Sequence, residues 1–292
     1  MEELADLLGT TEDSLSLTGR GWSLGKLALP RLGTFRKATG DSELGFSITA
    51  PDGTSWQFVA RGSDEQVRNA LAIAKEAFEN LAYEVFSTED VDEEWQDRFW
   101  DDAKRKYTQE ARSVYAKILA GELRQPGSIS KMTLSVLDDL DQRTAEIFQR
   151  YCTLAARFSR ITAVMYEPPD LDWADNGLAE FGVDYEDIGR LAEHGLIRDA
   201  SSQMEATLYI DRTEDIPNAV TLQFMIAGTA YNLKAVPGKD YTHMQIVLAT
   251  ATGNELARFV EPSPDVDVHA YTSKLFGEME KKGARVVQVN HI

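Results

Sequence analysis

The sequence predicts an α+β protein with a mainly helical N-terminal and central region, which contains a β-hairpin, followed by a mixed C-terminal domain. Apolar residues recur at helical spacing through the first half, and one short stretch alternates as strands do. After residue 170, short helical and strand-like segments alternate. We expect four parts: a basic, glycine-rich N-terminal segment (1–40), a hairpin plus helix (41–90), a helical domain (91–166) and a winged-helix-like α+β domain (170–292).

The first ninety residues predict an irregular segment, a hairpin and a helix. Residues 1–40 show little periodicity, and Pro30 interrupts any helix there. Residues 44–62 alternate on either side of a turn signal at residues 51–53, which indicates a two-stranded hairpin. Ser63 is a suitable N-cap for a helix that runs from Asp64 to about Phe86.

A single amphipathic helix is predicted from about Asp92 to Leu123. Its apolar face recurs at steps of three or four residues: Trp95, Phe99, Ala103, Tyr107, Ala111, Val114 and Ile118. Acid-to-base pairs four residues apart are expected on the polar side: Glu94–Arg98, Asp101–Arg105 and Asp102–Lys106.

The segment after this helix contains a stop and two starts. Pro126-Gly127 ends the long helix, and Ser130 is placed to cap the next one. Asp141 is placed to cap a third helix, which is predicted to extend to Ile161. The apolar faces of three helices are therefore expected to meet around this segment.

The C-terminal third alternates short helices and strands. A helix is predicted from an Asp184 cap to His194, and Gly195 follows it as the left-handed terminator. Strands are predicted at residues 206–210, 219–227, 230–236, 243–249 and 284–289, and helices at 250–260 and 266–283. Helix, strand and hairpin in this order indicate a winged-helix-like domain.

Composition points to a soluble globular protein in the cytoplasm. Hydrophobic residues make up 43% and charged residues 27%, and no stretch approaches the ~20 apolar residues that span a bilayer. The acidic start does not look like a secretory signal. Cys152 is the single cysteine, so no intramolecular disulfide can form.

The net charge of −18 is unevenly distributed. Residues 167–215 hold 14 acidic residues and three arginines, whereas residues 14–40 hold five basic residues and no acid. An acidic body disfavours nucleic acid, and the basic stretch is where an anionic membrane surface or a partner could dock. The candidate contact residues are Arg20, Trp22, Lys26, Arg31, Phe35, Arg36 and Lys37.

No pattern in the sequence assigns a catalytic, cofactor-binding or metal-binding residue. The glycine-rich stretch before Lys26 lacks the hydroxyl residue and the glycine spacing of a phosphate loop. The acids near Gly177 miss two ligand positions of a calcium loop, and the four histidines lack zinc spacing. Asp265, Asp267 and His269 could hold a metal, although acids that enter a helix more often pair with its dipole.

Two reactive side chains have a structural interpretation. Glu122 could act as an acid or base, but we favour a role in tying the following turn by accepting backbone N–H bonds. Cys152 lies on an apolar helix side and is expected to be a buried structural thiol. The residues expected to build this structural motif are Gly121, Glu122, Pro126, Gly127, Ser130 and Asp141.

The central segment resembles a bacterial domain-of-unknown-function family. The residues that carry the resemblance are Tyr115-Ala116, Ile118 to Glu122, Pro126 to Ser128, Ser130, Thr133-Leu134 and Leu137. Two later motifs also look similar: Ile188, Leu191 and Gly195 to Ile197, then Thr250, Gly253, Glu255 and Leu256. The central motif is also loosely similar to abortive-infection alpha proteins, which are linked to defence against phage. Neither resemblance supplies catalytic residues.

We therefore expect a non-enzymatic bacterial cytosolic protein that acts through a protein partner or as a homo-oligomer, with a role in phage defence implied by the resemblance. One alternative is a winged-helix regulator that binds nucleic acid, which the four acids of the helix before His194 oppose. Another is a membrane-surface effector that uses residues 14–40. An unrecognised hydrolase built from distant acids also stays open.

Overall fold

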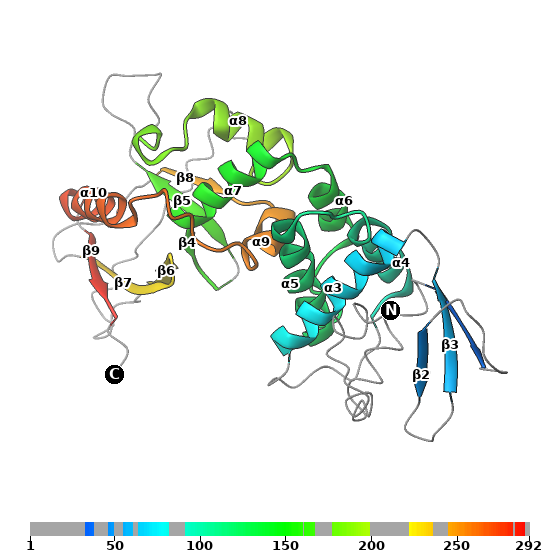
Figure 1. Cartoon of the computed structure of the whole chain (residues 1–292). Coiled ribbons are helices and arrows are strands. Elements are labelled where there is room, and N and C mark those ends of the chain that lie inside the picture. Colours follow the sequence, from blue (N-terminus) through cyan, green and yellow to red (C-terminus); the bar gives the residue numbers. More distant parts are fainter. Residues whose placement is uncertain are drawn as a thin grey trace. The chain divides into compact units, whose positions relative to one another are not determined.

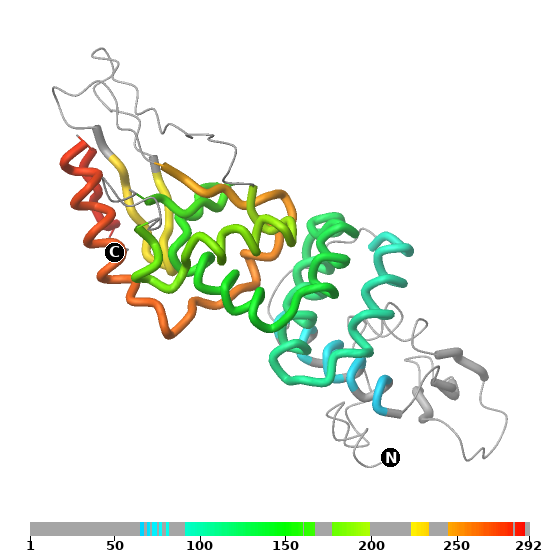
Figure 2. Tube along the Cα trace, turned by 90° about the horizontal axis from the view of Figure 1, so that it is seen from above, coloured from blue at the N-terminus to red at the C-terminus, as the bar shows by residue number. Residues whose placement is uncertain are grey.

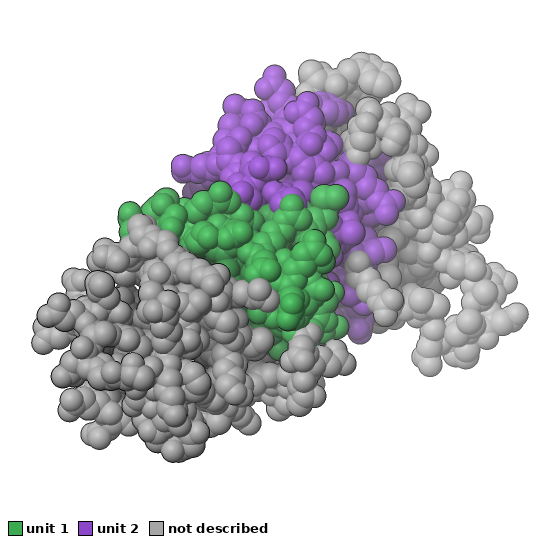
Figure 3. Space-filling model, turned by 90° about the vertical axis from the view of Figure 1, so that its right-hand side faces the viewer, with its two compact units in different colours: residues 1–134 green, residues 135–292 purple. Residues whose placement is uncertain are grey.

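A computed structural model describes residues 33–37, 46–49, 55–60, 64–81, 91–159, 161–166, 177–198, 222–235, 245–282 and 284–289. The chain is an α+β protein and divides into two compact units, residues 1–134 and 135–292, which Figure 3 colours separately. The four-part division expected from the sequence stays a prediction. The boundary between the two units falls within helix α6 (Lys131–Asp139).

The first unit begins with a small antiparallel sheet. Strands β1 (Gly33–Lys37), β2 (Phe46–Thr49) and β3 (Ser55–Ala60) lie in the order β1-β3-β2. The predicted hairpin is confirmed, because Phe46 pairs with Phe58 and Ile48 with Trp56. The expectation of an irregular segment up to residue 40 is wrong at residues 33–37, because β1 pairs along β3.

Two helices replace the single helix predicted from Asp92 to Leu123. Helix α3 (Asp64–Leu81) is followed by α4 (Glu93–Ala103) and α5 (Gln109–Arg124), which are separated by a turn. The turn is tight, since the Arg105 N–H donates to the Asp102 carbonyl. Thr108 then caps α5 by accepting from the Ala111 N–H at 3.2 Å.

The position of Tyr107 shows why the continuous helix was a wrong prediction. Its side chain is 55% exposed, whereas Phe99, Ala103 and Ile118 are fully buried, so the apolar stripe is interrupted between α4 and α5. The ion pairs follow the tightened turn. Lys104 pairs with Asp101 at 2.5 Å and Arg105 with Asp102 at 2.7 Å, each three residues apart rather than four.

An aromatic cluster forms the core between α4 and α5. Trp95 stacks on Phe99 with ring centroids 5.0 Å apart, and Tyr115 of α5 lies 5.6 Å from Phe99. Polar contacts hold α3 to α5: Arg112 donates to the buried Asn69 side chain at 3.0 Å. The core of this unit is therefore built from aromatic packing between helices.

The second unit contains a strand pair where the sequence predicts helix. Helix α7 (Gln142–Leu154) ends before the predicted Ile161, and β4 (Ala156–Arg157) and β5 (Thr162–Tyr166) follow. Ala155 already has extended backbone angles. Long-range pairing of β5 with the later strand β8, from Ala163↔Leu248 to Tyr166↔Gln245, outweighs the local helical pattern, because β5 is buried from Thr162 to Met165.

A six-stranded antiparallel sheet organises this unit, in the order β8-β5-β4-β6-β7-β9. The remaining strands are β6 (Leu222–Ile226), β7 (Thr229–Ala235), β8 (Gln245–Leu248) and β9 (Ala284–Gln288). β6, β8 and β9 lie within predicted strands, and β7 begins one residue before its predicted strand. The strand predicted at 206–210 lies outside the described residues.

Short helices surround this sheet (Figure 1). They are a 3₁₀ turn (Ala179–Phe181), α8 (Tyr185–Glu193), α9 (Ala251–Ala257) and α10 (Val268–Lys281). Figures 1 and 2 show α10 beside β7 and β9, and Phe276 of α10 meets Tyr231 of β7 with ring centroids 4.9 Å apart. The Tyr271 hydroxyl donates to the Met165 carbonyl at 2.7 Å and so fixes α10 to β5.

Candidate functional site

The central motif folds into a helix stop and a tight turn. Helix α5 ends at Arg124, and the Ser128 N–H donates to the Gln125 carbonyl at 3.1 Å. Gly127 has a φ of +79°, a left-handed conformation that residues with a Cβ adopt only at a cost. The Pro126-Gly127 pair therefore ends the helix as the sequence predicts.

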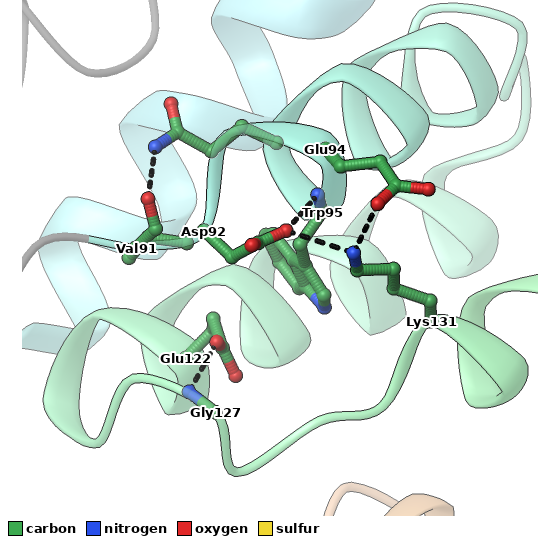
Figure 4. Close-up of polar contacts among 8 residues, drawn as sticks. Val91, Asp92, Glu94, Trp95, Glu122, Gly127 and Lys131 are labelled. Carbon is green, nitrogen blue, oxygen red and sulfur yellow. Dashed lines mark hydrogen bonds and ion pairs between the residues drawn. The ribbon is translucent and has the colours of Figure 1, made fainter.

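Glu122 holds this turn with its carboxylate. Its side chain is 1% exposed, and its Oε1 accepts from the Gly127 N–H at 2.6 Å. Its Oε2 accepts from the Ile129 N–H at 2.9 Å, with the Ser128 hydroxyl at 3.5 Å. Figure 4 shows the Glu122 side chain pointing at the Gly127 nitrogen. This is the turn-tying arrangement expected from the sequence, and both oxygens are occupied.

Two opposing effects act on the pKa of Glu122. Burial raises the pKa, because the charged form is poorly solvated inside the unit. The N–H groups of Gly127 and Ile129 lower it, but the effect of burial is larger, and the pKa of Glu122 lies above its ordinary value. Removal of this carboxylate would leave the Gly127 N–H and the buried Ile129 N–H without this acceptor.

An ion-pair cluster lies beside this turn at the start of α4 (Figure 4). Asp92 caps α4 by accepting from the Trp95 N–H at 2.8 Å. Lys131, the first residue of α6, lies 3.2 Å from Asp92 and also donates to Glu94. Both acids are well exposed, so solvent screens the pairs and their effect on stability is small.

The pKa values in this cluster shift in the directions that the contacts require. The Trp95 N–H and then the Lys131 ammonium lower the pKa of Asp92. Hydrogen bonds to Glu94 and then Asp92 raise the pKa of Lys131. A lysine held charged in this way is an ion-pair partner and not a base or nucleophile.

The predicted caps after the turn are present. The Ser130 hydroxyl accepts from the Thr133 N–H at 3.2 Å at the start of α6. Asp141 accepts from the Thr144 N–H at 2.7 Å at the start of α7, and Arg190 lies 3.4 Å from its other oxygen. The Thr144 N–H is the main reason why the pKa of Asp141 is lowered. Sequence reasoning missed Lys131 and Arg190, because partners 37 and 49 residues apart leave no local signal.

The two later motifs meet each other in the second unit. Gly195 ends α8 with a φ of +68°, and Ile197 forms a bridge with Ala249. The Thr250 hydroxyl donates to the Gly195 carbonyl at 2.6 Å and accepts from the Gly253 N–H at 3.0 Å. One threonine therefore caps α9 and fastens the end of α8. A threonine at the start of the helical segment was the available signal for this cap, whereas the link to Gly195, 55 residues away, left no local signal.

Gly253 is required at this junction by the space around it. A Cβ placed there would lie 1.9 Å from the Leu196 carbonyl oxygen. On the other side, the Asn254 side chain accepts from the Thr162 N–H at 2.7 Å and so connects α9 to β5. We call Gly195, Leu196, Thr250, Gly253 and Asn254 the α8–α9 junction.

The basic N-terminal candidates fall mostly outside the described residues. Arg20, Trp22, Lys26 and Arg31 lie there, whereas Phe35, Arg36 and Lys37 belong to the backbone of β1. In the register of the sheet they face Phe58, Gln57 and Trp56 of β3. A role for these residues in anionic-surface binding stays a prediction.

The groups weighed as metal ligands or nucleophiles have structural surroundings. Asp267 caps α10 by accepting from the Ala270 N–H at 2.9 Å, and His194 Nδ1 lies 2.9 Å from the Arg190 carbonyl at the end of α8. Burial raises the pKa of the Cys152 thiol to about 12. Across the described ranges, no group of three or more histidine, cysteine or acidic side chains is arranged to hold a metal.

The described residues line a small pocket, and none of their helices could span a membrane. A small, mainly apolar pocket of about 20 Å³ lies between Leu178, Phe181, Tyr271 and Leu275, with space for about one water molecule. None of the helices in the described part of the chain combines the length and apolarity that crossing a bilayer requires.

Comparison with known proteins identifies a family and no characterised relative. A family model described as "Protein of unknown function (DUF2806)" matches residues 59–275, so the chain belongs to this family. The matched range contains the Glu122 turn and the α8–α9 junction. No curated protein and no solved structure shows significant similarity to the chain.

Proposed function

We propose that this member of the DUF2806 family acts by binding another protein through the outer side of α8, and not by catalysis. The observation that carries the proposal is the exposed surface of this helix. Tyr185 is 46% exposed and lies between the exposed acids Asp184 and Glu186. Gly189, one turn later, has open space where a side chain would lie. An exposed tyrosine beside a glycine that leaves the helix backbone accessible forms a surface on which a partner can pack closely.

The rest of α8 supports this use. Ile188 and Leu191 are buried against the unit, and the Asp184–Asp187 capping box fixes the start of the helix. The outer side is therefore held rigid, and a rigid surface loses little entropy when it binds. By contrast, the polar groups of the two motifs are already engaged in holding the fold, as Glu122 and Thr250 illustrate.

The charge of the surface defines the partner's chemistry. Asp184, Glu186 and Glu193 are exposed, so a partner with basic and apolar side chains fits best. The same acids repel phosphates, which opposes the alternative of a nucleic-acid-binding regulator. The winged-helix-like interpretation belongs to the proposal: α8 takes the place of the recognition helix and the β6–β7 hairpin that of the wing.

The cellular setting is also part of the proposal. We place the protein in the bacterial cytosol as a phage-defence component, and this rests on the likeness of the central motif to abortive-infection alpha proteins. The family match assigns the chain to a family of unknown function and gives no information on a role in phage defence.

The test is phage plating on the native host with the gene deleted and then restored. We expect deletion to raise plating of at least one phage in a broad panel, and the wild-type gene to reverse this. Tyr185→Ala combined with Glu186→Lys should fail to reverse it, whereas Tyr107→Ala with Glu110→Lys, a matched change at exposed residues of the first unit, should succeed. Equal plating with and without the gene would refute the defence role. Full activity of the α8 variant would refute the α8 surface.

A second candidate keeps the basic stretch in view. Arg36 and Lys37 lie on β1, an edge strand of the three-stranded sheet. If residues 14–40 bind anionic lipid, the full chain should co-sediment with anionic vesicles in a salt-dependent way, and Arg31→Glu with Arg36→Glu should abolish this. The same variant tested for retention on DNA at about 50 mM salt separates lipid from nucleic acid.

A further inference from the structure

The two edges of the six-stranded sheet differ. At one edge, the Arg198 N–H donates to the Leu248 carbonyl of β8 at 2.8 Å, and Ile197 forms a bridge with Ala249. The segment after α8 therefore covers that edge. At the other edge, β9 pairs with β7, and no described residue bonds to its far side. Among the residues that the structure describes, this edge is uncovered, and such a strand edge is a template for pairing with another strand.

The register of β9 shows which groups are left open. The Val289 N–H donates to the Ala230 carbonyl of β7 at 2.9 Å. Because successive residues of an antiparallel strand bond to opposite sides, residues 285 and 287 also face β7. The backbone N–H and C=O groups of Ala284, Val286 and Gln288 therefore point to the open edge.

The side chains of β9 protect the strand edge only weakly, because Arg285 is the single charged residue of the strand. The strand reads Ala-Arg-Val-Val-Gln, with no proline and no lysine, and Val287 is 40% exposed. Met225 is 44% exposed and lies two strands away on the same side of the sheet. Met225 pairs with Ala230 and Val287 pairs with Asn232, and residues 230 and 232 of β7 point to the same side because they are two positions apart. Exposed apolar side chains therefore lie both on the edge strand and further in on the same face of the sheet.

We propose that β9 pairs with β9 of a second copy of this chain and so joins two sheets into one. This inference goes beyond the proposed role of α8 and concerns a different part of the second unit. A twofold axis perpendicular to the joined sheet places each residue of β9 opposite a residue of the second copy whose side chain lies on the same face of the sheet. Centred on Val286, the register puts Val286 opposite itself, Ala284 opposite Gln288, and Arg285 opposite Val287.

The charges of the strand permit this pairing. Arg285 is the single charged residue of β9, and the register keeps the two arginines apart. A heavily acidic chain offers few places where a second copy can approach without repulsion, and β9 is locally free of acids. The partner that fits this edge is therefore the chain itself.

The first experiment measures the mass of the full chain in solution by light scattering at about 100 µM. We expect about twice 32.6 kDa. Val286→Pro removes an N–H that faces the open edge and leaves the β7 ladder intact, so it should give a folded monomer. Val286→Thr keeps the N–H and should stay dimeric. A monomeric wild type, or a dimeric Val286→Pro variant with wild-type circular dichroism, overturns the proposal.

A charge exchange tests the register and remains informative if the proline variant fails to fold. Val287→Arg places two cations opposite each other across the axis and should weaken the dimer by at least tenfold. Adding Arg285→Glu should restore it, because each new arginine then faces a glutamate of the second copy. Failure of the double variant to recover would refute this register. Phage plating by the α8 variant is unaffected by these outcomes, so the two proposals fail separately.

Discussion

The Glu122 turn and the α8–α9 junction both hold the end of a helix, but they do so by different interactions. Each brings the end of one helix against a following segment. The Glu122 turn uses a buried charge that accepts two backbone N–H bonds, at 2.6 and 2.9 Å. The α8–α9 junction uses a neutral hydroxyl and a glycine whose missing side chain lets the Leu196 carbonyl come close.

The residues of the two motifs are therefore constrained by different interactions. A charged acceptor tolerates movement but depends on its ionisation and on its donors. A steric approach is independent of pH and tolerates no added atom.

The largest effect is expected for Gly253→Ala. The added Cβ would lie 1.9 Å from a backbone oxygen, so α9 must shift away from α8. We expect a loss of about 3 kcal/mol in the free energy of unfolding, measured by urea titration. Gly277→Ala is the control, because it adds a Cβ in open space on α10 and should stabilise by about 0.5–1 kcal/mol. Similar values for the two variants would remove the steric account.

Glu122→Ala should have the next largest effect. It leaves the N–H groups of Gly127 and Ile129 without an acceptor, of which that of Ile129 is buried. We expect a loss of about 2 kcal/mol. The matched control is Glu94→Ala, which removes an exposed acid from its pair with Lys131 and should cost less than about 0.5 kcal/mol. Equal losses would mean that Glu122 contributes no more than a surface pair.

Gly127→Ala separates backbone conformation from packing. Its φ of +79° disfavours a Cβ, but nothing lies within 4 Å of that position. The expected loss is therefore only about 1 kcal/mol, and Gly127→Asn should lose less, since asparagine tolerates the left-handed region. A loss as large as that of Gly253→Ala would show that the turn is sterically closed as well.

The smallest effect is the pH dependence that Glu122 introduces. Burial raises the pKa of Glu122 in the folded protein above its value in the unfolded chain. The folded state then binds the proton more tightly, so this contribution is full below the unfolded pKa and is lost as pH rises through the folded pKa. The stability advantage of wild type over Glu122→Gln should therefore shrink as pH rises from about 4. An advantage that grows with pH would contradict the direction of the shift.

The sequence was sufficient for features that depend on neighbours in the chain. The caps at Ser130, Asp141 and Asp184, the stop at Gly127 and the role of Glu122 all involve groups at most seven residues apart. Local chemistry determines such features, because the competing conformations are few.

The sequence was insufficient where distant pairing decides. The stripe from Trp95 predicts one helix, but Tyr107 is exposed and Thr108 starts a new one. The helical pattern after Leu154 yields to pairing of β5 with β8, whose partner residues lie 79 to 85 positions later in the chain. The link between Thr250 and Gly195 likewise joins residues 55 apart. Single-sequence periodicity carries no information about such contacts.

Hydrogen exchange at the Gly127 and Ile129 amides tests whether Glu122 acts as a structural acceptor of backbone hydrogen bonds. Both amides should be protected in the wild-type protein. In Glu122→Ala their exchange should rise by at least tenfold, while Glu94→Ala leaves them unchanged. If both amides exchange at the same rate with and without the Glu122 carboxylate, the turn is held by other means, and Glu122 becomes a candidate acid or base again.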